Sequence, residues 1–339
     1  MTGTPEFGVM LFTHRFGGQS ATEVLRLAAD VARTAEDLGF ESVWVTEHHF
    51  LTGYGLNPSA TTLAAYLLGA TQRVRVGTAV TILPTQSPVH VAEQTALLDQ
   101  LSGGRFDLGV GRAGPVVDHE VFGTGIERWR TGLPEALGLV LDAFGGAVAA
   151  DSEHYRFREV RPQPEPLTRP HPPVHVASTS DSGADLAARH GLPMLFFFSQ
   201  TADEQARLVA RYEQRTAARP VHSASVLAHV TDSPDEAERV VRERLAPVFA
   251  SGHSDYVMLE EYGGPRPTPA ELTAGILANQ PVGTPEVCAR RLAALIRDGG
   301  VGRVLLHVEA AGERDAVLAN VERLAGEVLP KVRAELEAA

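Results

Sequence analysis

The chain repeats one pattern of apolar and polar positions. A short, continuous apolar run is followed by a glycine or polar break, and then by a stretch with apolar residues at helical spacing. Continuous apolar runs are typical of parallel strands covered on both faces, and the longer stretches of amphipathic helices. Eight such units predict a closed (β/α)8 barrel. The predicted strands span 7–12, 41–46, 74–82, 105–111, 174–178, 194–199, 223–230 and 301–308, and the helices span 21–38, 58–70, 88–101, 130–144, 182–190, 201–215, 234–249 and 314–336.

Two segments interrupt this rhythm. Residues 145–173 are polar and rich in proline, and they predict a small hairpin. Residues 251–282 are rich in Gly and Pro and contain a short predicted helix at 269–277. A long loop in a compact domain is usually functional or disordered. We therefore expect one domain over 1–339, with insertions near 145–173 and 251–282.

Composition narrows the classes of protein that remain. Hydrophobic residues make up 44% of the chain and charged residues 21%, which is typical of a globular protein. The net charge of -12, without a dense Lys/Arg cluster, argues against a nucleic-acid or membrane-binding surface. The single cysteine, Cys288, excludes an intrachain disulfide and fits a reducing compartment. With no signal-peptide pattern and no apolar run of about 18 residues, we expect a cytoplasmic protein.

The first candidate site residues follow the second predicted strand. Glu47, His48 and His49 stand where that strand ends, which is where ligands bind in parallel α/β proteins. Because alternate residues of a strand point to opposite faces, at most one of the two histidines faces the barrel mouth. That histidine is a candidate general acid/base or hydrogen-bond donor. The alternative is a histidine pair that only caps the strand. No third ligand stands at metal-binding spacing, so we predict no metal.

Two later strand ends predict an anion site. Residues 109–114 match G-x-G-x-x-G, but in the fourth unit and without the βαβ context of a dinucleotide site. We interpret them as a glycine break at Gly111 that lets a ligand approach, with Arg112 binding a phosphate; the alternative is an arginine paired with Glu47 or another carboxylate. After the fifth strand, hydroxyl and N–H groups open a helix, although helix capping explains them as well. The candidates in this turn are Ser178, Thr179, Ser180 and Gly183.

Small residues end the third predicted strand, at 77–85. They would let a flat ring lie against the strand ends, although tight core packing explains them equally. The helix at 58–70 has almost no polar face, which predicts burial on both sides. Its second cover would be a partner subunit, as in a homodimer, or an insertion of the same chain.

In chain order, these features resemble one enzyme family nearly end to end. The sequence resembles the luciferase-like flavin monooxygenases, in particular the alkanal monooxygenase (bacterial luciferase) branch, whose fold is a TIM barrel with an insertion region. The segments that carry the resemblance are VWVTEHHF (43–50), LLGAT (67–71), VGTA (76–79), LPT (83–85), LLDQLS (97–102), GRF (104–106), FGT (122–124), GLPM (191–194) and PVGTP (281–285).

The resemblance implies an FMN site. Its phosphate would lie near Arg112 and the turn at 178–183, and its isoalloxazine over Ala79 and Val80, a position where relatives have a non-proline cis peptide. His48 matches the catalytic histidine of the family, and 251–282 corresponds to a mobile lid. The chain departs from the light emitters at Gly111, where they carry a reactive cysteine. This departure argues against light emission and aldehyde preference.

The function implied is an FMNH2- and O2-dependent monooxygenase of a two-component system, acting on a small organic substrate through a flavin C4a-(hydro)peroxide. The barrel uses all eight units and leaves no nicotinamide domain, so FMNH2 would come from a separate flavin reductase. The substrate is not specified by the sequence. Three alternatives stay open: an F420-dependent oxidoreductase of the same superfamily, a non-catalytic flavin-binding protein, and a metal-dependent hydrolase that uses His48 and His49.

Overall fold

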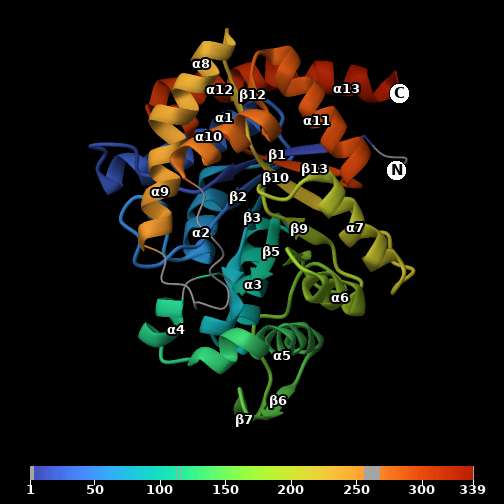
Figure 1. Ribbon diagram of the computed structural model, residues 1–339. Coiled ribbons are helices and arrows are strands. Elements are labelled where there is room, and N and C mark those ends of the chain that lie inside the picture. The colour runs from blue at the N-terminus through green and yellow to red at the C-terminus, as the bar shows by residue number, and fades with distance from the viewer. Residues whose placement is uncertain (1–3, 113, 115, 256–267, 339) are drawn as a thin grey trace.

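A closed ring of parallel strands forms the centre of the protein (Figure 1). The computed structural model describes residues 4–112, 114, 116–255 and 268–338. Within these residues, eight strands pair in the order β1-β2-β3-β5-β8-β9-β10-β13, and β13 pairs back onto β1 with Phe7 opposite Val304. The ring strands are β1 (Glu6–Leu11), β2 (Ser42–Val45), β3 (Arg75–Thr78), β5 (Phe106–Gly111), β8 (Val174–Ala177), β9 (Met194–Phe196), β10 (Ser223–Leu227) and β13 (Arg303–His307). The predicted (β/α)8 TIM barrel is confirmed.

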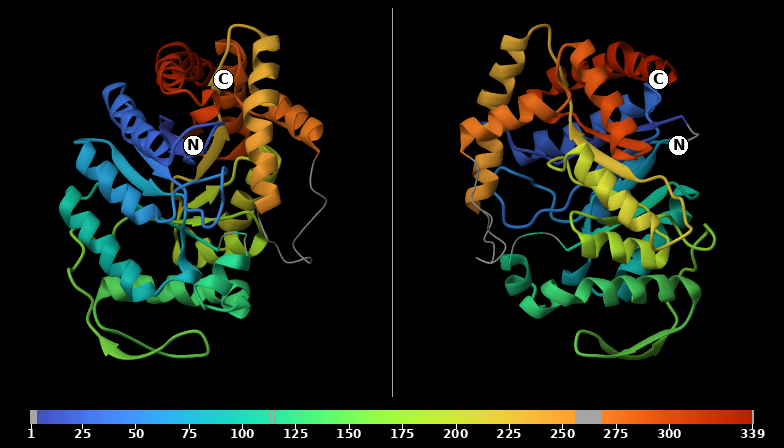
Figure 2. Two further views of the ribbon diagram at one scale, coloured as in Figure 1. Left: turned by 90° about the vertical axis from the view of Figure 1, so that its left-hand side faces the viewer. Right: turned by 45° about the vertical axis from the view of Figure 1, so that its right-hand side comes forward.

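Helices surround the ring on its outer side (Figure 2). The first begins with the capping box expected from the sequence, in which the Ser20 side chain accepts from the Glu23 backbone N–H. The last runs from α12 through a π-helical turn, Leu324–Val328, into α13. The outer helices are α1 (Ala21–Asp37), α2 (Ala60–Ala70), α3 (Pro88–Ser102), α5 (Ile126–Gly145), α6 (Asp181–His190), α7 (Ala202–Glu213), α11 (Pro285–Gly299), α12 (Arg314–Arg323) and α13 (Leu329–Glu337).

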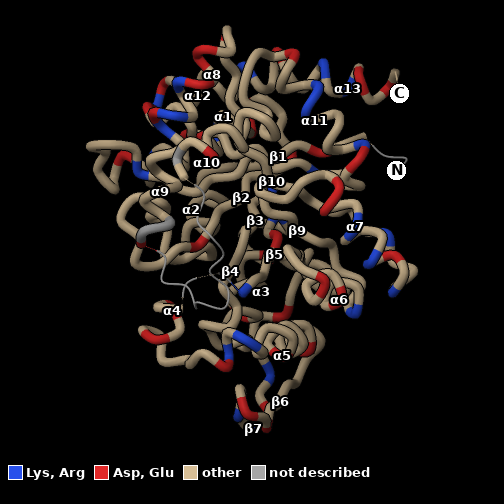
Figure 3. Tube along the Cα trace, in the orientation of Figure 1, with Lys and Arg blue, Asp and Glu red and all other residues tan. Residues whose placement is uncertain are grey.

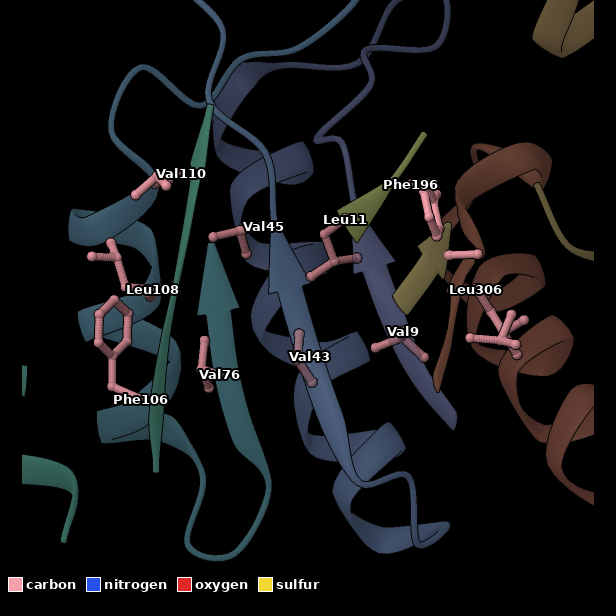
Figure 4. Packing of buried hydrophobic residues seen from close by; sticks show 14 of the residues in the cluster. Val9, Leu11, Val43, Val45, Val76, Phe106, Leu108, Val110, Phe196 and Leu306 are labelled. Atoms are coloured by element: carbon pink, nitrogen blue, oxygen red, sulfur yellow. The ribbon is translucent and has the colours of Figure 1, made fainter. Parts of the chain in front are cut away.

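Strand alternation divides the buried residues between two clusters. Val9, Leu11, Val43 and Val45 point outward and pack against the helices, in the cluster shown in Figure 4. The residues between them, such as Trp44, point inward and belong to a second cluster in the barrel interior and mouth. Because both faces of each strand are covered by apolar groups, the strands appear in the sequence as continuous apolar runs.

Two predicted strands are interrupted. The run at 74–82 forms β3 and a separate β4 (Thr81–Ile82), with a cis peptide bond between Ala79 and Val80 in the gap. The run at 223–230 leaves the ring after β10, and its last residues form β11 (His229–Val230). β11 pairs in parallel with β12 (Val282–Gly283), outside the ring. An apolar run does not show where the chain leaves the ring, since both parts are buried.

The seventh unit is longer than predicted, and its outer helix was assigned wrongly. The helix at 234–249 is part of an excursion made of α8 (Pro234–Val240), a π-helical turn, α9 (Ala246–Asp255) and α10 (Pro269–Asn279). The helix that covers the ring is α11, which packs against α7 and α13. Residues 256–267, in the middle of the insertion predicted at 251–282, lie outside the described residues, as does any lid formed there.

The insertion predicted at 145–173 contains a hairpin, as expected. β6 (Val148–Asp151) pairs antiparallel with β7 (Arg156–Val160) below α5 in Figure 1. A short helix, α4 (Val116–Val121), precedes α5 and was not predicted. Basic and acidic residues occur together along outer helices such as α7 (Figure 3), where Arg207 pairs with Asp181 of α6. Across the described residues, no helix has the length and apolar character that a membrane crossing requires.

Candidate active site

The predicted site residues lie on one sector of the barrel rim. His48 follows β2, Ala79 and Val80 follow β3, Gly111 ends β5 and Arg112 follows it, and the turn at 178–183 follows β8. These four strands are consecutive neighbours in the ring, and all are parallel. Their carboxyl ends therefore meet at the same mouth, where TIM-barrel enzymes place their active sites.

The carboxylate of Glu47 fastens this part of the rim together. It is buried and accepts hydrogen bonds from the backbone N–H groups of Ala60, at 3.0 Å, and Ile82, at 3.4 Å. His49 Nε2 and the Gln86 side-chain amide each lie 3.3 Å from Oε1 of the same carboxylate. Glu47 thus links the end of β2 to the start of α2 and to the β3–β4 region. The sequence alone indicated only that Glu47 adjoins the two histidines.

His48 and His49 point in different directions, as strand alternation predicts. The His48 ring contacts Phe12 and Tyr54 at centroid distances of 6.0 and 5.0 Å, while His49 lies against Phe122 on the outer side. Gly55 packs against the His48 ring so closely that a Cβ there would collide with Nδ1. The orientation of His48 is therefore fixed by its surroundings.

The hydrogen bonds of His48 assign its tautomer. Its Nδ1 lies 3.1 Å from the hydroxyl oxygen of Thr46, whose own proton is directed to the carbonyl of Phe12 at 3.4 Å. The Thr46 oxygen then accepts from Nδ1–H, which leaves Nε2 with a lone pair. Burial, and then His14 and His49 nearby, lower the pKa of His48 to about 3. At neutral pH the ring is therefore uncharged, and its free nitrogen is a hydrogen-bond acceptor but only a weak base.

Gly111 allows three strand ends to approach one another. A Cβ at this position would lie 2.7 Å from Val80 Cγ2 and 3.2 Å from Ala177 Cβ. The neighbouring Arg112 is half-buried, and its guanidinium carbon lies 4.2 Å from the centroid of the Trp129 ring, which contributes a cation–π contact. Ala79, Val80 and Ala177 remain partly exposed, so an apolar surface stands beside a fixed cation.

The turn after β8 has two kinds of residue. Ser178 is fully buried, and its hydroxyl donates to the Val176 carbonyl at 3.1 Å, so its proton is used within the protein. Thr179 and Ser180 are exposed at the N-terminus of α6, where Ser180 is the N-cap and accepts from Gly183 N–H. Gly183 lies against the turn, since a Cβ there would be 3.1 Å from Ser178 Cα. The capping interpretation is correct for Ser180, and the helix N-terminus faces the rim as an anion site requires.

A group of buried polar residues at the mouth escaped the sequence analysis. His14, Tyr54, His307 and Glu309 surround Phe12, within the cluster of the barrel mouth. His14 follows β1 and His307 ends β13, so both stand at strand ends like His48. Applying the same rule to the first and last strands would have found them. Among the described residues, no group of three His, Cys, Asp or Glu side chains is arranged to hold a metal ion.

Comparison with known proteins agrees with this architecture. Residues 5–303 match the family model of the luciferase-like monooxygenases. The alkanal monooxygenase alpha chain of Photorhabdus laumondii is 31% identical, covering 96% of this chain and 97% of the relative.

Two solved structures have the same fold. The monooxygenase RslO1 from Streptomyces bottropensis superimposes with a TM-score of 0.84 at 24% identity, covering 96% of this chain and 99% of that one. The oxygenating constituent of 3,6-diketocamphane monooxygenase from Pseudomonas putida, solved in complex with FMN, gives 0.76 at 18% identity, with 97% and 99% covered. On the family match and the full-length relative together, this chain belongs to the luciferase-like monooxygenase family and is a flavin-dependent monooxygenase.

Proposed function

We propose that the protein is the oxygenating component of a two-component system. It would take reduced FMN from a separate flavin reductase and use O2 to oxygenate a small organic substrate. The observation that supports this function most directly is the meeting, on one rim sector, of His48, the apolar surface of Ala79 and Val80, and the cation of Arg112. The ring uses every strand–helix unit of the described residues, which favours an external source of reducing equivalents.

The residues present fit both chemically distinct parts of FMN, the phosphate and the isoalloxazine ring. Arg112 and the α6 N-terminus, with Thr179 and Ser180 exposed, supply a cation and backbone N–H donors for a phosphate. The partly exposed Ala79 and Val80 offer a flat apolar surface for an isoalloxazine, next to Gly111. Ser178 and Gly183 hold the turn in shape. When bound, reduced FMN supplies the electrons and the reaction with O2.

The role proposed for His48 follows from its protonation. Its Nε2 lone pair accepts a hydrogen bond from the reacting group, and its neutral form persists at physiological pH because burial lowers its pKa. The aromatic side chains around it, Phe12 and Tyr54, exclude water from the same space. Thr46 keeps the accepting nitrogen turned away from the strand.

A rapid-mixing experiment tests the function. Protein loaded with chemically reduced FMN is mixed with O2, and we expect a long-lived absorbing species that delays the appearance of oxidised FMN at least about tenfold relative to free FMNH2. His48→Ala should shorten this delay, whereas His171→Ala, a half-buried histidine beside Phe144, should preserve it. Failure to bind FMNH2, or tight binding of reduced F420 instead, would reject the proposal in favour of the F420-dependent alternative.

We also propose a homodimer formed through α2 and α3. These adjacent helices expose Tyr66, Leu97 and Leu101, with 55, 46 and 76% of their surfaces accessible. The apolar helix predicted to be buried on both sides is thus left uncovered on its outer side by the described residues. An exposed apolar face of this kind is typical of a subunit interface.

A further inference from the structure

Two imidazoles at the foot of the barrel mouth have nitrogens without a partner in the described structure. These are Nε2 of His14 and both ring nitrogens of His307, on side chains that are 2% and 1% exposed. The two rings contact each other at a centroid distance of 4.8 Å, and each also contacts Phe12. Buried polar atoms are normally satisfied, so three orphaned nitrogens on two rings in contact indicate a site for a polar group.

The free nitrogen of His14 is an acceptor. Its Nδ1 faces the backbone carbonyl of Tyr54, and a carbonyl oxygen only accepts, so the ring proton is on Nδ1. Burial, and then the neighbouring His307, lower the pKa of His14 to about 3, which keeps the ring neutral. Nε2 therefore presents a lone pair, and its complement is an O–H or N–H donor.

His307 lies beside Glu309. Its Nε2 lies 3.1 Å from Oε2 of the Glu309 carboxylate, the oxygen that also accepts the Phe12 backbone N–H at 2.6 Å. This approach is not aligned as a hydrogen bond, because Nε2 is among the nitrogens without a partner. Burial lowers the pKa of His307 to about 3, so its ring is neutral and has one N–H donor and one acceptor free. The pair thus presents two acceptors and one donor.

We propose, on the basis of the function proposed above, that His14 and His307 bind a hydroxyl group of a planar, aromatic substrate. A hydroxyl donates to Nε2 of His14 and accepts from the free N–H of His307. An aldehyde or ketone oxygen accepts only, so it would leave the His14 acceptor unpaired, and such mismatches discriminate strongly between substrates. Neither residue is assigned to the reacting atoms; both act in substrate positioning and specificity.

The surrounding side chains explain the preference for an aromatic substrate. Phe12 is in ring contact with Tyr54 and Phe198, and Tyr54 and Phe198 both contact Phe249, at centroid distances of 5.4–6.1 Å. Such a cluster packs well against the faces and edges of a flat ring. Ala79 and Val80 pack against the same cluster, so a substrate held here would adjoin the proposed flavin site.

The side chains that cover the two histidines come from outside the ring. Tyr54 lies in the segment between β2 and α2, and Phe249 lies on α9 of the excursion. Phe198 also lines a groove of about 410 Å³ between α10, α11 and the segment after β9.

A binding measurement without flavin tests this subsite. The probes are 2-naphthol and 2-methoxynaphthalene, which share the ring and the oxygen but differ in the donor hydrogen. We expect wild-type protein to bind 2-naphthol at least about tenfold more tightly, because one hydrogen bond to a buried acceptor is at stake. His14→Phe should bring the ratio of affinities close to one, whereas His307→Phe should weaken both probes, because its N–H can donate to the oxygen of either one. His229→Phe, which changes another buried imidazole far from the mouth cluster, should leave the ratio unchanged.

The outcomes separate this inference from the proposed function. Equal affinities in the wild type, no binding of either probe at about 1 mM, an unchanged ratio in a folded His14→Phe variant, or unchanged affinities for both probes in a folded His307→Phe variant would each overturn the subsite. Equal affinities in the wild type also indicate that only water binds these nitrogens. If hydroxyl preference is present while FMNH2 chemistry fails, the subsite stands and the proposed function is rejected.

Discussion

The guanidinium of Arg112 lies over the face of Trp129, 4.2 Å from the centroid of a ring that is 2% exposed. Arg112 directly follows β5 and Trp129 belongs to α5, so the end of a ring strand and an outer helix together fix the cation at the rim. A guanidinium held in this way loses less rotational freedom when it binds a phosphate. The contact makes Arg112 a pre-organised part of the proposed flavin site.

Replacing Arg112 by Gln should weaken FMNH2 binding by about 10- to 100-fold, the value of a charge-assisted hydrogen bond to phosphate. Anaerobic titration followed by flavin fluorescence measures the change. Arg128→Gln is a matched control, because Arg128 also stacks on an aromatic ring, that of Tyr155 at 4.6 Å, but on the hairpin side of α5. Equal losses in the two variants would show that the effect is structural.

Two glycines in one loop, Gly53 and Gly55, make it possible to test whether the orientation of His48 matters while the histidine itself is kept. In Gly55→Ala the new Cβ meets His48 Nδ1 and displaces the ring, whereas at Gly53 a Cβ would lie 3.5 Å from Ser251 Oγ, an ordinary contact. We expect Gly55→Ala to reduce kcat for oxygenation by about 100-fold, comparable to losing the histidine, and Gly53→Ala to change it little. Steady-state kinetics with a reductase-coupled supply of FMNH2 compares them. Wild-type kcat in Gly55→Ala would mean that His48 needs no fixed orientation.

The rim could be predicted from the sequence to the extent that its residues follow strands. His48, Arg112 and Ser180 were placed at the rim because each follows a recognisable apolar run, and parallel strands bring their ends together. Val80 lies inside such a run, and only the family resemblance pointed to it. The interruption between β3 and β4, after Thr78, could not be predicted. The strand residues on both sides of it are equally buried and differ only in their hydrogen-bond partners.

Other parts were missed for a different reason. Glu47 looked only like a neighbour of the candidate histidine His48, and the structure shows its contacts with Ala60 and Ile82, which are distant in sequence. The pairing of His14 with His307 depends on closure of the ring, which joins residues almost 300 positions apart. α11 was overlooked because α8 to α10 offer an earlier run with helical periodicity in the same unit.

The buried histidines should make the protein sensitive to mild acid. The pKa values of His14, His48 and His307 are lowered to about 3, mainly by burial, and those of His222 and His229 to about 4. Between these values and about 6.5 the unfolded chain binds protons that the folded protein does not. The free energy of unfolding is therefore highest above pH 6.5 and falls as the pH drops below it, by up to about 1.4 kcal/mol per pH unit for each imidazole.

Burial acts in the opposite direction on two carboxyl groups. It raises the pKa of Asp118 to about 6 and also that of Glu309, which favours the folded state in acid, but the imidazoles outnumber them. Urea unfolding at pH 7.5 and 5.5 measures the balance, and His14→Phe should reduce the difference between the two free energies. Equal stability at both pH values would mean that the native protein accommodates charged imidazoles at these sites.

If the exposed apolar face of α2 and α3 forms the proposed dimer interface, a charge placed on it should change the oligomeric state. Leu101→Glu should dissociate the proposed homodimer, because a carboxylate would have to be desolvated at the centre of an apolar contact. Sedimentation equilibrium at several protein concentrations follows the monomer–dimer balance. Leu167→Glu is the control, since Leu167 is 51% exposed outside α2 and α3. A monomeric wild type, or a dimer unaffected by Leu101→Glu, would contradict the proposed interface.

The pairing of β11 with β12 has a consequence for how relatives of this enzyme can diverge. His229 faces Val282 in that ladder, and Cys288 of α11 reaches the carbonyls of His229 and Pro281. The chain thus leaves the barrel along β11 and returns along β12, and these paired strands form a stem from which α8 to α10 extend. Insertions or deletions distal to this stem alter what reaches the reaction chamber while sparing the scaffold beneath, so substrate range and folding can evolve almost independently.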